Sequence, residues 1–393
     1  MILAERDRLK EYFAATSAMT VLAVQDTTDL DLTGNRVSGK IGSLNYPKRK
    51  GYYTHSHLLF DTKGIGLGLF DQYMWNRNPE YFGQNRALWA LEDKESHRWL
   101  SHFLNLQSFF ADFPQHRVVD ICDREGDFYE MFQARTLANV HLLIRSNKDK
   151  ELVSGEKLWS TLAAQTASYV YKMKIFDDKG KGHELIFQVK FCPLTIPANY
   201  RASRDQPEQS NPVHLNGVLA EQVNPLQSWQ KKPITWRLLT TLPVGNFEQA
   251  LQIVEFYIRR WRIEEFHFVL KQGCRIEHSQ LKEPQSVENA ITFYSLLAWK
   301  VLNLRYAASE QAQTPIEDFG FTAKDFYVLA TFLSRMGKAR IDPEKPCAGI
   351  GEFAKYVKVL ATSSKSKAPP GVKVLWVGLE KLAFLVKAFE AFT

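Results

Sequence analysis

The sequence predicts an α/β protein with a mixed β-sheet core, an antiparallel β insertion and a helical C-terminal tail. Short apolar runs with the length of buried strands lie at residues 21–24, 117–122 and 141–145, and segments with helical spacing lie between and after them. From 147 to 243, apolar residues instead alternate with polar ones, which is typical of antiparallel hairpins. Strands that alternate with helices favour a sheet with helices packed on its faces.

The elements ahead of the insertion follow from the same patterns. Residues 1–15 have the spacing of an amphipathic helix, and the first apolar strand ends just before Asp26. A basic loop with several glycines covers 40–51. The remaining elements, in chain order, are a strand at 55–60, a return strand through 67–69, a helix at 95–111, a strand at 117–122, a helix at 125–136 and a strand at 141–145.

This order divides the chain into four predicted parts. They are an N-terminal helix at 1–15, a core made of 16–146 and 244–305, the β insertion at 147–243 and a separate helical tail at 306–393. The end of the tail is strongly apolar. A chain end of this kind either docks on the core or pairs with a partner.

Composition sets limits on the class of protein. A hydrophobic fraction of 45% over 393 residues is enough for a sizeable core, and the net charge of +7 permits an anionic partner. The four cysteines have no C-x-x-C spacing and no disulfide framework is expected, so a reducing cytoplasm fits. No apolar run approaches the roughly 18 residues of a membrane span. The N-terminus is charged from its fifth residue, unlike a signal peptide.

The segment Tyr257–Lys271 gathers chemically active side chains on one predicted helix face. Tyr257, Arg260, Glu264 and Lys271 lie within an arc of roughly 60° on an ideal helix. A carboxylate can hold a divalent metal beside a phosphate, and flanking cations can bind neighbouring phosphates. A solvated helix face with ordinary ion pairs remains the alternative. The opposite face is apolar: Phe256, Ile263, Phe266 and Leu270.

Two further carboxylates stand where apolar strands end, namely Asp26 and Asp123. Because neighbouring strands of a sheet lie about 5 Å apart, two such aspartates can share a metal ion. With Glu264 packed over the same edge, the three form a candidate two-metal site for phosphoryl transfer. Taken singly, each aspartate can also be a strand-end cap.

At these residues the sequence resembles a known family, the DDE transposases of bacterial insertion sequences that carry the Y-x2-R-x3-E-x6-K (YREK) signature. Tyr257, Arg260, Glu264 and Lys271 meet every spacing of the signature. The words QDTT, CDREGD and WRIEEFH around the three carboxylates match as well, and the likeness is greatest to the transposon-five-type cut-and-paste transposase. The resemblance covers nearly the whole chain after residue 15.

The resemblance implies an RNase H-like core and a DNA transposase that nicks strands, forms hairpins and transfers strands, in bacterial cytoplasm at the nucleoid. It implies a homodimer on double-stranded DNA, both transposon ends and target, with the tail as the dimerising segment. Two Mg²⁺ or Mn²⁺ ions are implied on Asp26, Asp123 and Glu264. Trp236 would stack on a flipped base. The implied DNA contacts are Tyr257, Arg260, Lys271, Trp236 and Arg145.

One departure from the family pattern keeps other functions open. Only 25 residues precede Asp26, so the N-terminal helix is expected to be a remnant, without the small end-binding domain usual in this family. An N-truncated inhibitor that acts by dimerisation is one alternative, and an RNase H-like nuclease is another, although the complete signature argues against it. Trp236 can also be a core residue. Lys48, Arg49 and Lys50 predict a phosphate contact or a solvated loop equally well.

Overall fold

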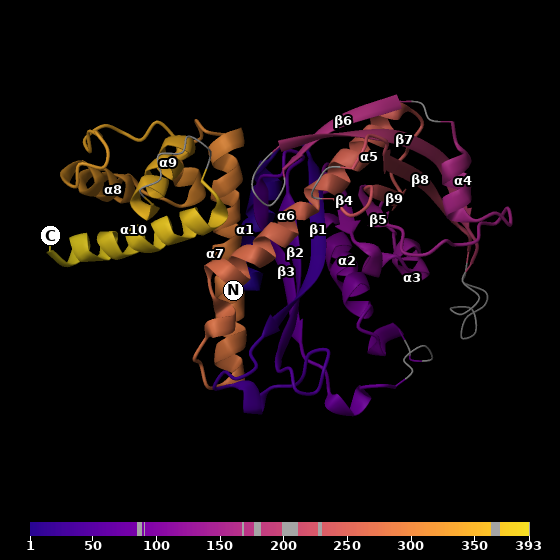
Figure 1. Cartoon of the computed structure of the whole chain (residues 1–393), viewed down its shortest axis with the longest axis horizontal. Coiled ribbons are helices and arrows are strands. Elements are labelled where there is room, and N and C mark those ends of the chain that lie inside the picture. The colour runs from indigo at the N-terminus through magenta and orange to yellow at the C-terminus, as the bar shows by residue number, and fades with distance from the viewer. Residues whose placement is uncertain are drawn as a thin grey trace. The chain divides into compact units, whose positions relative to one another are not determined.

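The computed structural model confirms the predicted α/β class. Helices alternate with the strands of a large mixed sheet, and further helices follow at the C-terminus (Figure 1). The structure describes residues 1–84, 89, 91–166, 169–176, 182–198, 211–226, 230–362 and 370–392.

Five strands form the core part of the sheet in the described chain: β1 (Thr20–Asp31), β2 (Gly51–Phe60), β3 (Gly66–Trp75), β4 (Arg117–Cys122) and β5 (Val140–Arg145). Their order in the sheet is β3-β2-β1-β4-β5. The pairs β1–β4 and β4–β5 are parallel, whereas β2–β3 is antiparallel. An antiparallel hairpin beside parallel strands makes this the mixed sheet that the sequence predicts.

The central strands are covered on both faces, which explains why they are continuous apolar runs rather than alternating ones. The run at 21–24 in β1 is fully buried, and so are Val118 and Val119 in β4. The predicted helices at 1–15 and 95–111 correspond to α1 (Ile2–Ala15) and α2 (His97–Phe110). Burial of apolar surface of this kind stabilises a core by roughly 25 cal/mol per Å².

The helix predicted at 125–136 is shorter than expected. A 3₁₀ turn (Arg124–Gly126) and a separate short helix, α3 (Tyr129–Gln133), replace it. Between them Asp127 leaves the helical region of backbone conformation, with ψ 69°. Its carboxylate accepts a hydrogen bond of 2.6 Å from the backbone N–H of Asn147, a long-range contact that periodicity cannot reveal.

The β insertion continues the core sheet. Its elements are α4 (Leu158–Ala164), β6 (Tyr169–Phe176), β7 (Gly182–Ile196), β8 (Val213–Gln222) and β9 (Thr235–Thr240). β9 pairs antiparallel with β5, and β8, β7 and β6 follow in antiparallel pairs. The predicted antiparallel insertion is therefore confirmed, and the described strands join into one nine-stranded mixed sheet.

The contacts divide the chain into two compact units. Unit 1 contains residues 1–11, 27–84 and 262–393, and unit 2 contains 12–26 and 85–261. β1 contributes to both, and the signature segment is divided after Trp261. The four parts that the sequence predicts, with their boundaries at 15, 146, 243 and 305, remain a prediction.

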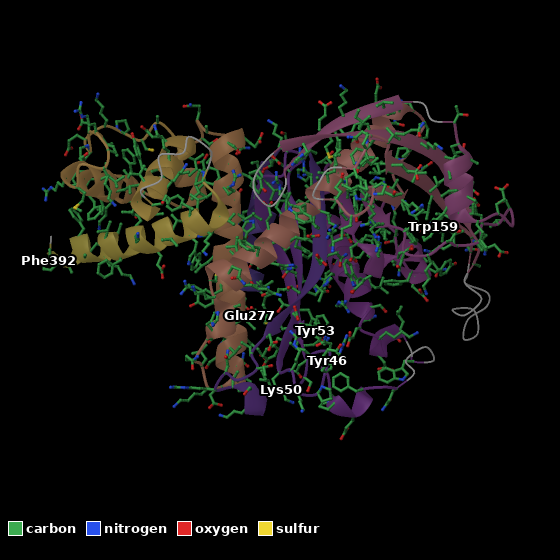
Figure 2. The ribbon with its side chains drawn as sticks, in the orientation of Figure 1. Tyr46, Lys50, Tyr53, Trp159, Glu277 and Phe392 are labelled. Atoms are coloured by element: carbon green, nitrogen blue, oxygen red, sulfur yellow. The ribbon has the colours of Figure 1, made fainter. Side chains whose placement is uncertain are left out.

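The C-terminal helices pack together within unit 1. They are α7 (Pro284–Glu310), α8 (Ala323–Arg335), α9 (Ile350–Ala361) and α10 (Val372–Phe392). α10 contacts the other three, and it approaches α9 closely at Gly378, where a Cβ would meet the Val357 carbonyl oxygen at 2.4 Å. Phe384 and Phe392 remain 73% and 91% exposed, and Phe392 is labelled near the C-terminus in Figure 2. Within the described residues, neither α10 nor another helix is long and apolar enough to cross a membrane.

His141 on β5 makes a testable contribution to the pH dependence of stability. Burial, with the charges of Arg135 and Arg117, lowers its pKa from 6.5 to about 4. Between these pH values the unfolded chain binds a proton that the folded chain does not, so acid favours unfolding. We expect the free energy of unfolding to fall by about 2 kcal/mol as the pH drops from 6.5 to 4. Denaturant titrations at both pH values should show a smaller fall for His141→Asn, and an unchanged fall would contradict the assignment.

Candidate active site and DNA-binding residues

The signature segment is not the single regular helix that the sequence predicts. Its first part belongs to α5 (Phe247–Arg259), and a second helix, α6 (Trp261–Phe268), begins after Arg260. A π-helical turn (Val269–Gly273) then carries Lys271. The turn closes through a 2.9 Å hydrogen bond from the Cys274 N–H to the Val269 carbonyl, which adds a residue to that turn. The arc calculated for an ideal α-helix therefore does not extend to Lys271.

The apolar face of this segment is confirmed. All four predicted residues are buried: Phe256, Ile263, Phe266 and Leu270. α5 begins at Asn246, whose side chain accepts a hydrogen bond from the Gln249 N–H and so caps the helix.

Asp26 and Asp123 occupy equivalent positions on neighbouring parallel strands. The register pairs Thr20 with Arg117 and ends with Val24 paired to Ile121. Asp26 and Asp123 each follow two residues later, so the same offset, continued past the paired stretch, brings them level. Side chains at equivalent positions of adjacent parallel strands leave the same face of the sheet about 4.8 Å apart. Asp123 follows β4 directly, as predicted. Asp26 lies within β1 rather than after it, because β1 continues beside β2 to Asp31.

The two aspartates have different polar partners. Asp26 forms an ion pair with Arg260, with 3.3 Å between Oδ2 and Nη1. Asp123 accepts a 2.7 Å hydrogen bond at Oδ1 from the Glu125 N–H, so it also caps the turn that follows. Capping this turn and binding a metal ion are therefore compatible roles for Asp123.

Tyr257 lies close to several other predicted site residues of unit 2. It is only 4% exposed, which corrects the expectation that it lies on an accessible helix face. It is buried because α5 packs on β7, β8 and β9. Burial raises the pKa of its phenol, opposed by the charges of Arg260 and Arg145, while Asp123 raises it further. The phenol therefore keeps its proton at neutral pH.

Trp236 adjoins this group from β9. Its ring stacks on Phe187, with 5.2 Å between centroids and 5° between planes, and meets Tyr257 edge-on at 6.1 Å. Trp236 is half-buried, so it is neither a fully buried core residue nor an open platform. Arg145 donates a 3.2 Å hydrogen bond to the Thr235 carbonyl beside it. Unit 2 therefore contains six of the eight predicted site residues: Asp26, Asp123, Arg145, Trp236, Tyr257 and Arg260.

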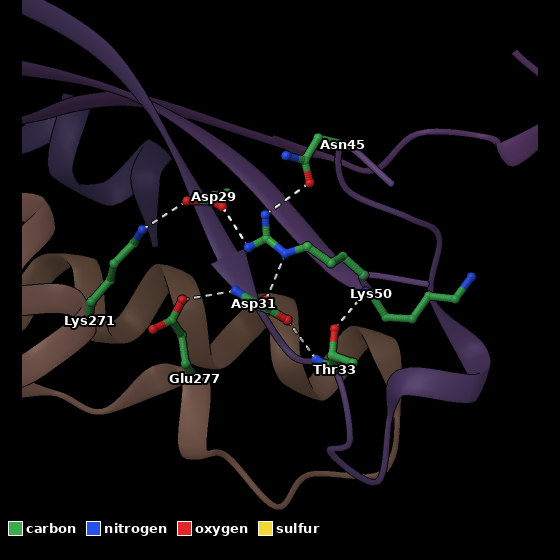
Figure 3. A network of polar contacts seen from close by, with 8 residues as sticks. Asp29, Asp31, Thr33, Asn45, Lys50, Lys271 and Glu277 are labelled. Atoms are coloured by element: carbon green, nitrogen blue, oxygen red, sulfur yellow. Dashed lines mark hydrogen bonds and ion pairs between the residues drawn. The ribbon is translucent and has the colours of Figure 1, made fainter. Parts of the chain in front are cut away.

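The other two predicted residues belong to unit 1. Glu264 lies half-buried in the first turn of α6. Lys271 forms an ion pair with Asp29, with 3.0 Å between Nζ and Oδ1 (Figure 3). Burial by itself would raise the pKa of Asp29, but hydrogen bonds and charge from Lys271 and Arg49 outweigh it, so the pKa is lowered.

Sequence reasoning missed the partner of Lys271. Asp29 and Asp31 lie two residues apart on β1 and so share a face of the strand. That spacing was visible in the sequence. Their cationic partners were not, because Lys271 is 242 residues away from Asp29 along the chain.

The chemistry of Asp26 and Asp123 fits a divalent cation. Carboxylate oxygens are the ligands that Mg²⁺ prefers, and the two residues stand level on adjacent strands. In the described part of the chain, no three His, Cys, Asp or Glu side chains form a group that could hold a metal ion. Glu264 belongs to the other unit, so its place as third ligand remains a prediction.

Comparison with known proteins supports the predicted class. Residues 131–299 match the family model of the transposase DDE domain. This range includes Glu264 and the rest of the YREK residues, and it begins after Asp26 and Asp123. The match bears out a transposase domain in general, whereas the YREK signature and the transposon-five type are finer predictions that it does not test.

Among solved structures, the chain is similar to the piggyBac transposase, determined by cryo-EM as a synaptic complex with hairpin DNA. The TM-score is 0.35 and the sequence identity is 10%, over 94% of this chain. The chain spans 58% of the length of that protein's chain.

Proposed function

We propose that this protein is a DDE transposase that nicks double-stranded DNA, closes a hairpin and transfers strands. The observation that carries this proposal is that Asp26 and Asp123 each lie two residues beyond the last paired residues, Val24 and Ile121, of adjacent parallel strands, in a chain that matches the transposase DDE domain at 131–299. Two carboxylates at neighbouring strand positions are the donor set of a metal-dependent phosphoryl transfer site.

Asp26, Asp123 and Glu264 would hold two Mg²⁺ or Mn²⁺ ions. When bound, such ions activate the attacking oxygen and stabilise the leaving oxygen of an in-line displacement. Arg260 balances the charge of Asp26 across 3.3 Å. Without counter-charges, adjacent carboxylates would raise each other's pKa.

The remaining residues would bind the DNA substrate. Arg260 and Lys271 would hold backbone phosphates, and the protonated phenol of Tyr257 would donate a hydrogen bond to another. Arg145 from β5 and Trp236 from the β insertion would also contact the DNA, with Trp236 stacking on a base that leaves the helix. Dimerisation through the tail on transposon ends and target DNA is part of the same proposal.

The direct test is cleavage of supercoiled plasmid and of linear duplexes by the purified chain, with Mg²⁺, Mn²⁺ or neither. We expect nicking only with a divalent ion. Metal-independent cleavage would contradict the proposal. Inhibition of an active transposase by a chain that itself cannot nick DNA would favour the dimerising inhibitor instead.

Lys271 provides a quantitative test of DNA binding. If it binds a phosphate, Lys271→Met should weaken binding and lower the slope of log affinity against log salt by about 0.9, because one counterion fewer is released. Fluorescence anisotropy over a range of salt concentrations measures both quantities. Lys324→Met is the matched control, since Lys324 is also ion-paired, at 2.7 Å to Glu390, in the same unit. Equal slopes for parent and Lys271→Met would assign Lys271 to a purely structural ion pair.

A further inference from the structure

Residues 43–50 form a loop with an unusual charge environment. The stretch 32–60 contains five basic residues and neither Asp nor Glu. The five are Arg36, Lys40, Lys48, Arg49 and Lys50. In the structure Lys40 pairs with Glu283, and Arg49 pairs with Asp29 and Asp31, so the positive charge that favours an anionic ligand comes from the other three. We call residues 43–50 the Arg49 loop.

Arg49 fastens this loop to β1. Its guanidinium donates from Nη2 to Asp29 at 3.0 Å and from Nε to Asp31 at 2.9 Å. Its third nitrogen, Nη1, donates to Asn45 at 2.9 Å, across the loop itself (Figure 3). A planar guanidinium serves three acceptors in fixed directions, which a lysine cannot do.

We call the contacts of Arg49 with Asp29, Asp31 and Asn45 the Arg49 clamp. The pKa shifts of its charged groups indicate that the clamp is stable. The hydrogen bond with Asp31 raises the pKa of Arg49, opposed by partial burial and reinforced by Asp29. Burial would raise the pKa of Asp31, but hydrogen bonds from Thr33 and the hydrogen bond and charge of Arg49 lower it. All three groups therefore stay charged at neutral pH.

Backbone contacts close the tip of the loop. The Leu44 N–H donates to the Arg49 carbonyl at 2.8 Å, and the Arg49 N–H donates to the Tyr46 carbonyl at 3.0 Å. The Ser43 hydroxyl donates to the Pro47 carbonyl at 3.0 Å. The tip therefore has a defined conformation before any ligand arrives, which reduces the entropy cost of binding.

The side chains at this tip face solvent. Tyr46, labelled in Figure 2, is 64% exposed, and Lys48 is exposed as well. In the part of the chain that the structure describes, Lys48 has no ion-pair partner, unlike Arg49. The clamp thus holds a phenol ring and an ammonium group in the solvent.

The clamp also connects the loop to the signature lysine. Asp29 accepts from Lys271 at Oδ1 and from Arg49 at Oδ2, both at 3.0 Å. A lysine ammonium has three donors, so Lys271 can bind a phosphate while it remains paired with Asp29. Lys271 and the loop are therefore held through one carboxylate.

We propose that the Arg49 loop is a second DNA-binding element, in which Lys48 binds a backbone phosphate and Tyr46 stacks on an unpaired base of the strand that Lys271 contacts. The inference rests on the proposed DNA-binding function. A solvated loop would need neither the three-way clamp nor an aromatic ring at its tip. Stacking on an aromatic ring does not depend on base identity, which suits an enzyme that acts on varied target DNA.

The probes are a fluorescent blunt duplex and the same duplex with a single-stranded 3′ overhang, with binding measured by anisotropy. We expect Lys48→Gln to lower the salt slope by about 0.9 on both probes. We expect Tyr46→Ala to weaken binding to the overhang duplex by about tenfold and to leave blunt-duplex binding unchanged. Lys63→Gln and Tyr73→Ala are matched controls, because both residues are exposed in the same unit.

Arg49→Lys tests the clamp, since it keeps the charge and loses the planar fork. We expect it to reduce overhang binding as much as Tyr46→Ala does, while thermal unfolding confirms a folded chain. Parental overhang binding by Arg49→Lys would overturn the positioning role of Arg49.

The outcomes separate the loop from the proposed function. If Lys271→Met loses affinity while Lys48→Gln and Tyr46→Ala bind as the parent does, the loop proposal is overturned and the proposed function stands. If all three variants bind as the parent does, the loop proposal is overturned and Lys271 is a structural ion pair. The proposed function itself is overturned if the parent binds neither probe or cleaves DNA without a divalent ion.

Discussion

Asp123→Ala is expected to abolish divalent metal binding and to lower the rate of DNA strand cleavage by about a thousandfold or more, since metal ions supply several kcal/mol of transition-state stabilisation. Asp123 stands level with Asp26 on the neighbouring strand. Removing one of two adjacent carboxylates leaves too few oxygen donors for Mg²⁺. Isothermal titration calorimetry with Mg²⁺ and Mn²⁺ measures the binding, and plasmid nicking measures the rate.

The design must separate the charge of Asp123 from its capping role. Asp123 accepts a hydrogen bond from the Glu125 N–H at 2.7 Å, and loss of a cap costs about 1 kcal/mol of stability. Asp123→Asn can keep the cap while it removes the charge, so it should lose metal binding and remain as stable as the parent. Asp61→Ala is the matched control, because Asp61 accepts a similar bond of 2.8 Å from the Ile65 N–H. Equal metal affinity in parent and Asp123→Ala would falsify the metal assignment.

Trp236→Ala is expected to leave nicking of the first strand intact and to slow hairpin closure by about tenfold or more. Closing a hairpin requires a base to leave the stack, at a cost of a few kcal/mol. An aromatic face can offset about 1–3 kcal/mol of this cost. Trp236 is half-buried and its plane is held by parallel stacking on Phe187, so its orientation is defined before DNA binds.

The measurement uses DNA that is already nicked, so that hairpin closure is the only chemical step. Trp236→Phe should recover much of the rate because it retains an aromatic face. Trp159→Ala is the matched control, a half-buried tryptophan of the same insertion whose Nε1 donates to the Ser146 hydroxyl (Figure 2). Hairpin closure at the parental rate by Trp236→Ala would return Trp236 to a packing role.

The sequence by itself determined the fold class of this protein. Apolar runs at 21–24 and 117–122 mark strands buried on both faces, since only such strands lack a polar side. Alternation after residue 147 marks the antiparallel insertion. Both patterns can be recognised within a short segment, because the side chains that are buried in the fold are mostly apolar. Asp26 and Asp123 also followed from the sequence, because Asp26 comes two residues after the first run and Asp123 directly after the second.

The ends of helices and local changes of helix type could not be predicted from apolar periodicity. The segment Tyr257–Lys271 has helical spacing throughout, yet the chain breaks the helix at Arg260 and widens it to a π turn at Lys271. Periodicity reports an average over several turns and does not register one added residue.

Only the tertiary structure decided the partners of the charged residues. Arg260 meets Asp26 across 234 residues of sequence, and Lys271 meets Asp29 across 242. Tyr257 is buried because α5 packs on the sheet that the insertion extends. Ion pairs and burial depend on which segments the fold brings together. The residue types of the site are therefore properties of the sequence, whereas their pairing belongs to the folded chain.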